Sequence, residues 1–133
     1  MDFFLQDPDE VKLPPEEVRL RLIQVTLQPG SNKVKVHLEL TPFQKRPNVE
    51  IIITTSSGKE AAHTSILEVM LPKMELTMHL RRPQPGETYT LSALVFFVQQ
   101  PPEGEEPDPQ LRQIVDTREV IVQPHSAAPA DRV

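Results

Sequence analysis

Apolar and polar residues alternate along short segments of this chain, and prolines lie at the ends of these segments or outside them. The clearest example is the segment 33–40, in which every second residue from Val34 to Leu40 is apolar and the residues between them are polar. A period of two is typical of a β-strand that turns one face to a core and the other to water. The chain contains 15 prolines, and a proline in a helix interior is strongly destabilising. The pattern therefore predicts an all-β protein.

Several further segments alternate in the same way, and turn residues separate them. The segment 18–27 changes phase between Leu22 and Ile23, which predicts a β-bulge or a strand that crosses from one sheet to the other. About seven such segments in a chain of immunoglobulin size are typical of an antiparallel β-sandwich. We therefore expect a single sandwich domain.

A short motif surrounds the single tyrosine of the chain. Residues 85–93 read PGETYTLSA, in which a Pro-Gly turn leads to Tyr89 and then to alternating apolar residues. This motif resembles the E–F corner of fibronectin type III domains, where the tyrosine ring packs at the core edge and its hydroxyl bonds to backbone just upstream. The resemblance implies an immunoglobulin-like topology with a structural tyrosine corner at Tyr89. The strands that it implies are 18–27, 33–40, 48–55, 61–70, 73–81, 88–99 and 113–123.

The formal charge of −5 is distributed unevenly along the 133 residues. The segment 1–17 contains six acidic residues and one lysine, and the segment 99–112 contains four acidic residues and one arginine. The segment 18–98 contains ten basic and six acidic residues. We expect an acidic, proline-rich N-terminal arm at 1–17, the sandwich at 18–123 and a flexible C-terminal tail at 124–133. Because the basic residues are scattered and no aromatic stacking platform accompanies them, nucleic-acid binding is not expected.

Targeting and membrane-spanning segments are not visible in the sequence. The longest uninterrupted apolar stretch is 93–98, whereas a transmembrane helix needs about 20 residues. The first ten residues lack the positive region and the apolar core of a secretory signal peptide. We therefore expect a cytoplasmic protein with no membrane span.

Residues that could carry catalysis are few. The chain has no cysteine, no glycine-rich phosphate loop and no GxSxG nucleophile motif, so thiol, phosphate-loop and serine-hydrolase chemistry are disfavoured. We interpret the acids at Glu39, Glu50, Glu68 and Glu75 as ordinary solvating charges on strand surfaces. The sequence therefore predicts neither a catalytic site nor a cofactor.

Histidines are the remaining candidates for metal ligands, and we interpret them as surface residues. His37 and His79 fall on the polar faces of two strands that would pair, where they could be cross-strand neighbours. A zinc site would need two further ligands, and the candidates are Glu39, Glu75 and His63. A ligand-binding module for a carbohydrate or a metal on this face is the alternative function.

Leu94, Phe96 and Val98 lie on the side of the segment 88–99 that is opposite its core residues. In an isolated sandwich they would form an exposed apolar stripe, which commonly marks a protein interface. Two interpretations remain open. In the first, a protein partner contacts the stripe. In the second, the N-terminal arm or residues 99–112 fold over it. Residues 99–112 are likewise either a recognition loop or a solvated spacer. The sequence favours a non-catalytic interaction or structural module within a larger assembly, with a protein partner or self-association.

Overall fold

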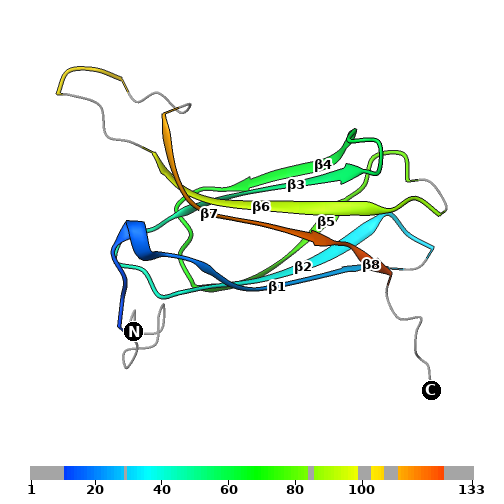
Figure 1. The fold of residues 1–133 in the computed structure, drawn as a ribbon, viewed down its shortest axis with the longest axis horizontal. Coiled ribbons are helices and arrows are strands. Elements are labelled where there is room, and N and C mark those ends of the chain that lie inside the picture. The colour runs from blue at the N-terminus through cyan, green and yellow to red at the C-terminus, as the bar shows by residue number, and fades with distance from the viewer. Residues whose placement is uncertain (1–10, 29, 84–85, 99–102, 107–110, 125–133) are drawn as a thin grey trace.

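A computed structural model describes residues 11–28, 30–83, 86–98, 103–106 and 111–124 of the chain. Two β-sheets pack face to face, with their strands running along the long axis of the molecule (Figure 1). Within the described residues, the only helix is the single 3-10 turn η2 (Pro15–Glu17). The predicted all-β, immunoglobulin-like sandwich is confirmed.

The first sheet consists of β1 (Leu20–Leu27), β2 (Lys33–Leu40), β5 (Lys73–His79) and β8 (Gln123–Pro124). Its strand order is β5-β2-β1-β8. Strand β2 pairs antiparallel with both β1 and β5, and β8 pairs parallel with β1. Burial alternates along the whole of β2, as its period of two predicts.

The second sheet consists of β3 (Asn48–Thr55), β4 (Glu60–Ile66), β6 (Tyr89–Val98) and β7 (Arg112–Ile121). Its strand order is β4-β3-β6-β7, and all neighbours are antiparallel. In β6, every second side chain from Tyr89 to Phe97 is buried, because that face of the strand meets the first sheet.

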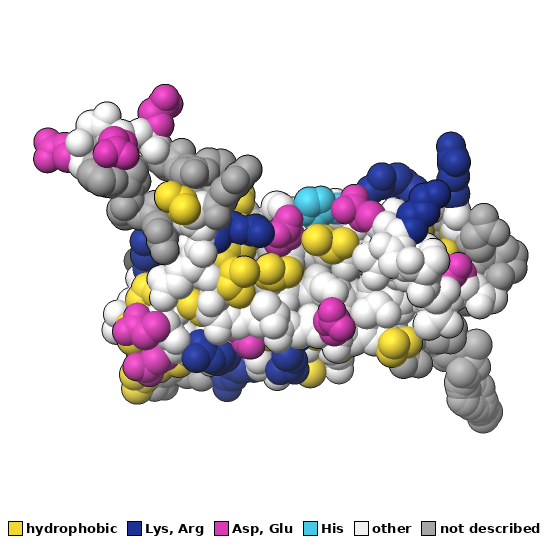
Figure 2. Space-filling view, turned by 45° about the horizontal axis from the view of Figure 1, so that its top comes forward, with side chains coloured by type: hydrophobic (Ala, Val, Ile, Leu, Met, Phe, Trp, Pro, Cys, Tyr) yellow, Lys and Arg dark blue, Asp and Glu magenta, His cyan; other side chains and the backbone are white. Residues whose placement is uncertain are grey.

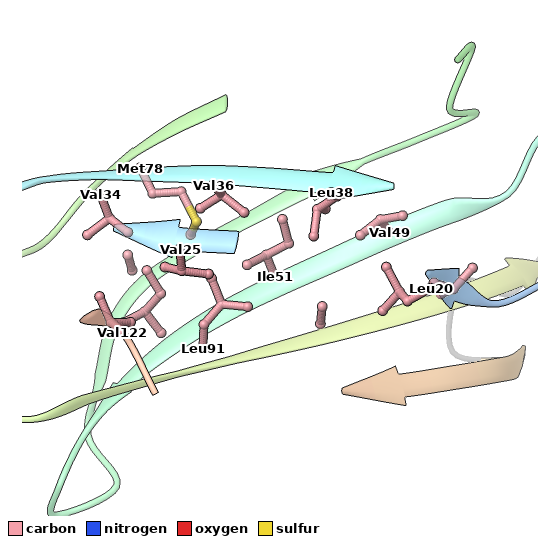
Figure 3. Packing of buried hydrophobic residues seen from close by; sticks show 14 of the residues in the cluster. Leu20, Val25, Val34, Val36, Leu38, Val49, Ile51, Met78, Leu91 and Val122 are labelled. Atoms are coloured by element: carbon pink, nitrogen blue, oxygen red, sulfur yellow. The ribbon is translucent and has the colours of Figure 1, made fainter. Parts of the chain in front are cut away.

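One aliphatic core fills the space between the two sheets. Val36 of β2, Ile51 of β3 and Leu91 of β6 are at most 1% exposed, and Figure 3 shows side chains from both sheets meeting in this layer. Full burial of one such side chain contributes about 1.5–3 kcal/mol. The core is therefore the main source of the stability of the fold.

The strand expected at 61–70 is shorter than predicted. Strand β4 ends at Ile66, and Glu68 adopts a φ of 53° that no strand can continue through. The buried Asn48 stabilises this exit, because its Oδ1 accepts a hydrogen bond from the Glu68 N–H at 2.9 Å. Val69 then donates its N–H to the Pro47 carbonyl at 2.8 Å and turns its side chain into the core. The strands expected at 33–40 and 48–55 have the predicted bounds, and the ends of the other strands differ from the expected ones by one or two residues.

The last strand, expected at 113–123, is divided between the two sheets. Strand β7 ends at Ile121, the buried Val122 donates its N–H to the Tyr89 carbonyl, and β8 then pairs with Thr26 and Leu27 of β1. The chain therefore crosses from the second sheet to the first at Val122.

Side chains of β7 also bind the free backbone of β1. The Asp116 carboxylate accepts a hydrogen bond from the Leu20 N–H at 2.8 Å, and the Arg118 guanidinium donates one to the Leu20 carbonyl at 3.2 Å. The register between β1 and β2 shifts between Leu20 and Leu22. The bulge that the phase change predicted is therefore present, slightly earlier in the strand.

The N-terminal arm expected at 1–17 is in part attached to the sandwich. Leu13 forms a parallel bridge with Phe43, in which its N–H bonds to the Pro42 carbonyl and its carbonyl accepts the Gln44 N–H. Val18 is fully buried. Residues 1–10 of the arm and 125–133 of the tail lie outside the described residues.

Tyr89 is 3% exposed at the first position of β6, and its proposed role can be tested by removing the hydroxyl. We expect Tyr89→Phe to lower the free energy of unfolding by about 1 kcal/mol, the scale of one buried hydrogen bond. Urea denaturation with an unchanged m-value would measure this loss. A variant as stable as the wild type would contradict the tyrosine corner.

Candidate functional site

The outer face of the second sheet carries an unusual mixture of apolar and charged side chains. We call it the Phe96 face, and its members are Glu50, Ile52, His63, Leu94, Phe96, Val98, Arg112, Ile114 and Ile121. Figure 2 shows hydrophobic side chains gathered over the sheet, with basic, acidic and histidine side chains beside them. Outer faces of sandwiches are usually polar, so this face differs from a purely solvating surface.

A β-bulge in β7 determines which side chains reach this face. The register between β6 and β7 shifts after Val95, so that Val115 is the extra residue and Ile114 lies opposite Phe96. Arg112 consequently lies opposite Val98. Without the extra residue, strict alternation would turn Ile114 and Arg112 toward the other side of the sheet.

Arg112 covers the ring of Phe96. The guanidinium carbon lies 4.5 Å from the ring centroid, a distance typical of a cation–π contact. Phe96 is only 5% exposed. Phe96 is therefore not part of an exposed stripe. Of the two open interpretations, coverage by residues 99–112 holds for Phe96, because Arg112, the last residue of that range, lies over its ring.

Glu50 links Arg112 to the other side of the sheet. Its Oε1 accepts a hydrogen bond from Arg112 Nη1 at 2.8 Å, and its Oε2 accepts one from His63 Nε2 at 2.7 Å. The bond from Arg112 holds the pKa of Glu50 below its ordinary value of 4.5, partial burial opposes this, and the bond from His63 lowers the pKa further. The carboxylate therefore stays charged between two donors, with only 15% of its side chain exposed.

Each strand of the second sheet contributes one member to this network. His63 belongs to β4, Glu50 to β3, Phe96 to β6 and Arg112 to β7. Such charge-assisted hydrogen bonds fix side-chain geometry. The Phe96 face therefore presents a preorganised polar network surrounded by apolar side chains.

The other two predicted stripe residues lie beside this network. Leu94 is next to Glu50 in the register and Val98 lies opposite Arg112, and both are half-buried. The exposed apolar residues are instead Ile114 and Ile121 of β7, at 48% and 53%. Neither was expected, because their alternation is interrupted at the bulge.

Sequence reasoning missed the network because it interpreted Glu50 as a solvating charge. The available signal was Ile52, an apolar residue on the face of β3 that should be exposed. An acid two residues from such a position lies on the same, partly covered face. A carboxylate in that setting needs a cationic partner.

The polar face of the first sheet is organised around His37. His37 lies opposite Glu75 and His79 lies opposite Lys33, so the prediction that the two histidines are cross-strand neighbours is wrong. His37 Nε2 bonds to Glu39 at 2.8 Å, and its Nδ1 lies 3.5 Å from Glu75 without a hydrogen bond. No group of three or more candidate ligands is placed to hold a metal within the part of the chain that the structure describes.

Comparisons with known proteins identify the fold only. No protein-family model and no curated protein matches the sequence. A glycosyl hydrolase family 2 member from Bacteroides cellulosilyticus is similar in structure, with a TM-score of 0.55 and 13% identity over 80% of this chain and 15% of that chain. A β-glucuronidase from glycoside hydrolase family 2 is similar at a TM-score of 0.57 and 13% identity, over 80% of this chain and 12% of that one. The chain thus resembles one β-sandwich part of much larger proteins.

Membrane-spanning helices are not found in the described residues, since none of the helices there is long and apolar enough to cross a bilayer.

The network makes stability depend on the charge of Glu50. Because the pKa of Glu50 is lowered in the folded state, its stabilisation is present above the ordinary glutamate pKa and disappears as the pH falls through the lowered value. We expect Glu50→Gln to cost about 1–2 kcal/mol at neutral pH, and the difference from wild type to shrink in this acid range. Chemical denaturation across the acid range measures both.

The exposed Glu17 provides the control for this experiment, since Glu17→Gln removes a carboxylate that forms no ion pair with the described residues. A pH-independent difference between Glu50→Gln and wild type would contradict the role of the charged carboxylate.

Proposed function

We propose that this chain is a non-catalytic protein-interaction module within a larger assembly, and that the Phe96 face is its contact surface. The observation that carries the proposal is the Phe96 ring under the Arg112 guanidinium, flanked by Leu94 and the exposed Ile114. Aromatic residues and arginine are enriched in protein interfaces, and they dominate binding energy where a partner excludes water from them.

The apolar members of this face supply the area that a partner would bury. Ile114 and Ile121 are both about half exposed on the same strand, and Val98 and Leu94 extend the apolar surface onto β6. An exposed apolar surface bordered by charged groups is typical of an interaction site. The strand β7 lies at the edge of its sheet, so this surface is accessible from the side as well as from above.

The polar network lowers the cost of binding. Glu50 holds Arg112 and His63 at hydrogen-bond distance, so these side chains lose little freedom when a partner arrives. Preorganisation of this kind improves affinity without additional contact area. The remaining donors of Arg112 are directed by the same contacts and can bind an acceptor on the partner.

The fold comparison supports a role as one domain of a larger protein or assembly. In the two glycoside hydrolases described above, the similar part is 15% and 12% of the chain. This architecture therefore occurs as one part of larger proteins.

The alternative function is a ligand-binding sandwich that uses the face around His37. A hollow of about 390 Å³ lies there, and it is bordered by His37, Glu75 and Lys35 among others. The Nδ1 atom of His37 is buried without a hydrogen-bond partner and lies 3.5 Å from Glu75, so a metal at this position would need further ligands. Sugar binding has less support, since the described aromatic rings of Phe43, Tyr89, Phe96 and Phe97 are all buried and none is free for stacking.

A charge placed on the exposed part of the Phe96 face should weaken partner binding. We expect Ile114→Glu to weaken binding by about 2 kcal/mol or more, roughly thirtyfold in Kd, because an unpaired carboxylate would be buried in the contact. Affinity capture from the native lysate identifies the partner, and titration of that purified partner measures the Kd. Ile114 is a better probe than Phe96, whose burial makes Phe96→Glu a risk to folding.

The matched control is Gln24→Glu, which adds the same charge at an exposed position on the outer face of the first sheet. Equal capture of the same partner by Ile114→Glu and by wild type would eliminate the Phe96 face as the contact surface.

The alternative function makes a separate prediction about zinc. If the His37 face binds a metal, thermal unfolding of the wild type will shift to higher temperature as zinc is added, by the equivalent of about 2.7 kcal/mol at one hundred times Kd. The shift should disappear in His37→Gln. A melting temperature independent of zinc would remove this alternative.

A further inference from the structure

A polar groove lies at the end of the sandwich formed by the β3–β4 turn and the β5–β6 connection. Its volume is about 820 Å³, and its walls include Ser56, Lys59, Arg81, Arg82 and Glu87. Figure 2 shows Lys and Arg side chains gathered at one end of the molecule. We call this feature the basic groove.

The positive charge of the basic groove is only partly balanced. The single ion pair there joins Arg81 to Glu60 at 2.8 Å, and both side chains are so exposed, at 65% and 45%, that the pair contributes little. Lys59 and Arg82 form no ion pair with any residue that the structure describes. Two cations of the groove are therefore available to an anionic partner, and a third can exchange its partner.

The second acid of the groove is Glu87, which binds backbone and hydroxyl groups and forms no ion pair with a described residue. The Glu87 carboxylate accepts hydrogen bonds from the Ser56 N–H at 3.0 Å, from the Ser56 hydroxyl at 2.6 Å and from the Thr88 N–H at 3.2 Å. These bonds, those from Ser56 first, hold the pKa of Glu87 below its ordinary value. Glu87 thus joins the two loops that form the groove and shapes its wall.

Arg82 has a backbone conformation that residues other than glycine rarely adopt. Its φ is 49°, in the left-handed region, where an arginine is strained relative to glycine. Strained residues of this kind are concentrated at binding sites. The Arg82 side chain is therefore held in place at a cost in backbone strain, which a loop that only connects two strands would not need.

Exposed acids lie at the opposite end of the molecule. Glu103, Glu105 and Glu106 belong to the connection between β6 and β7, and none of them forms an ion pair with a described residue. We call residues 103–106 the acidic segment. In Figure 1 residues 103–106 lie at the end of the molecule away from the β3–β4 turn. The acidic segment and the basic groove therefore cannot meet within one molecule.

We propose that the basic groove binds the acidic segment of a second copy of this chain. The charges are complementary, since the cations Lys59, Arg81 and Arg82 outnumber the two acids of the groove and the acidic segment carries carboxylates only. Guanidinium groups bind carboxylates through paired hydrogen bonds. Four residues span at most about 14 Å when extended, so the acidic segment is short enough to lie in one groove. Each copy uses one groove and one segment, so the contact is heterologous and joins copies head to tail.

Complementary variants test this arrangement. The groove variant carries K59Q, R81Q and R82Q, and the segment variant carries E103Q, E105Q and E106Q; all six positions are exposed. We expect wild type to associate with increasing concentration in analytical ultracentrifugation. Each variant alone should be monomeric, with its dissociation constant raised at least about tenfold by the loss of several surface pairs. An equimolar mixture should form dimers and nothing larger, because one intact groove meets one intact segment.

Salt and a charge-matched control distinguish this contact from others. Association of wild type should weaken between about 0.05 and about 0.5 M NaCl, because exposed charges are screened. The control carries K12Q, K45Q and K73Q, which remove the same charge from exposed positions outside the groove, and it should associate as wild type does. Thermal melting confirms that every variant is folded.

The proposal fails if wild type stays monomeric at all concentrations, or if the mixed variants do not dimerise. It also fails if only the groove variant loses association, since the occupant of the groove is then not the acidic segment. Ile114→Glu leaves the groove and the segment intact, so its effect on partner binding is measured independently of these results.

Discussion

The aliphatic core shared by the two sheets determines where every other feature of the molecule can lie. Because successive side chains of a strand point to opposite faces, each strand commits one face to this core. On β6 the committed face runs from Tyr89 to Phe97 and is buried throughout. Groups that bind anything else are therefore restricted to the two outer faces and the two ends of the sandwich. The Phe96 face lies on one outer face, and the basic groove lies at one end.

Departures from strict alternation position the charged groups. The extra residue Val115 turns Arg112 and Ile114 onto the same face as Phe96, and the register shift near Leu20 accompanies the hydrogen bonds from Asp116 and Arg118. Bulges are common at sheet edges and next to functional sites. In this sandwich the regular parts of the strands supply stability, and the bulges determine the direction of side chains that could bind a partner.

The regular strands could be predicted from the sequence, and the network could not. The period of two from Val34 to Leu40 determines which side chains enter the core, because one face must leave water. The bulge at Val115 leaves no such pattern in the sequence. Ile114 and Val115 are adjacent and both apolar, so the sequence does not indicate which of them points outward. The contact between Arg112 and Phe96 joins residues of different strands, and their proximity follows from that bulge. The tyrosine corner at Tyr89 stays a prediction.

The parallel pairing of β8 with β1 determines how the sandwich would respond to tension. The two strands run in the same direction, so a force that pulls β1 from its first residue and β8 from its last acts along both strands. The backbone contacts of Thr26 and Leu27 with β8 would then be loaded together in shear. The bonds of Asp116 and Arg118 to Leu20 lie on the same path. If neighbouring domains pulled on both ends of the chain, the pairing of β1 with β8 would bear the force before the core was exposed.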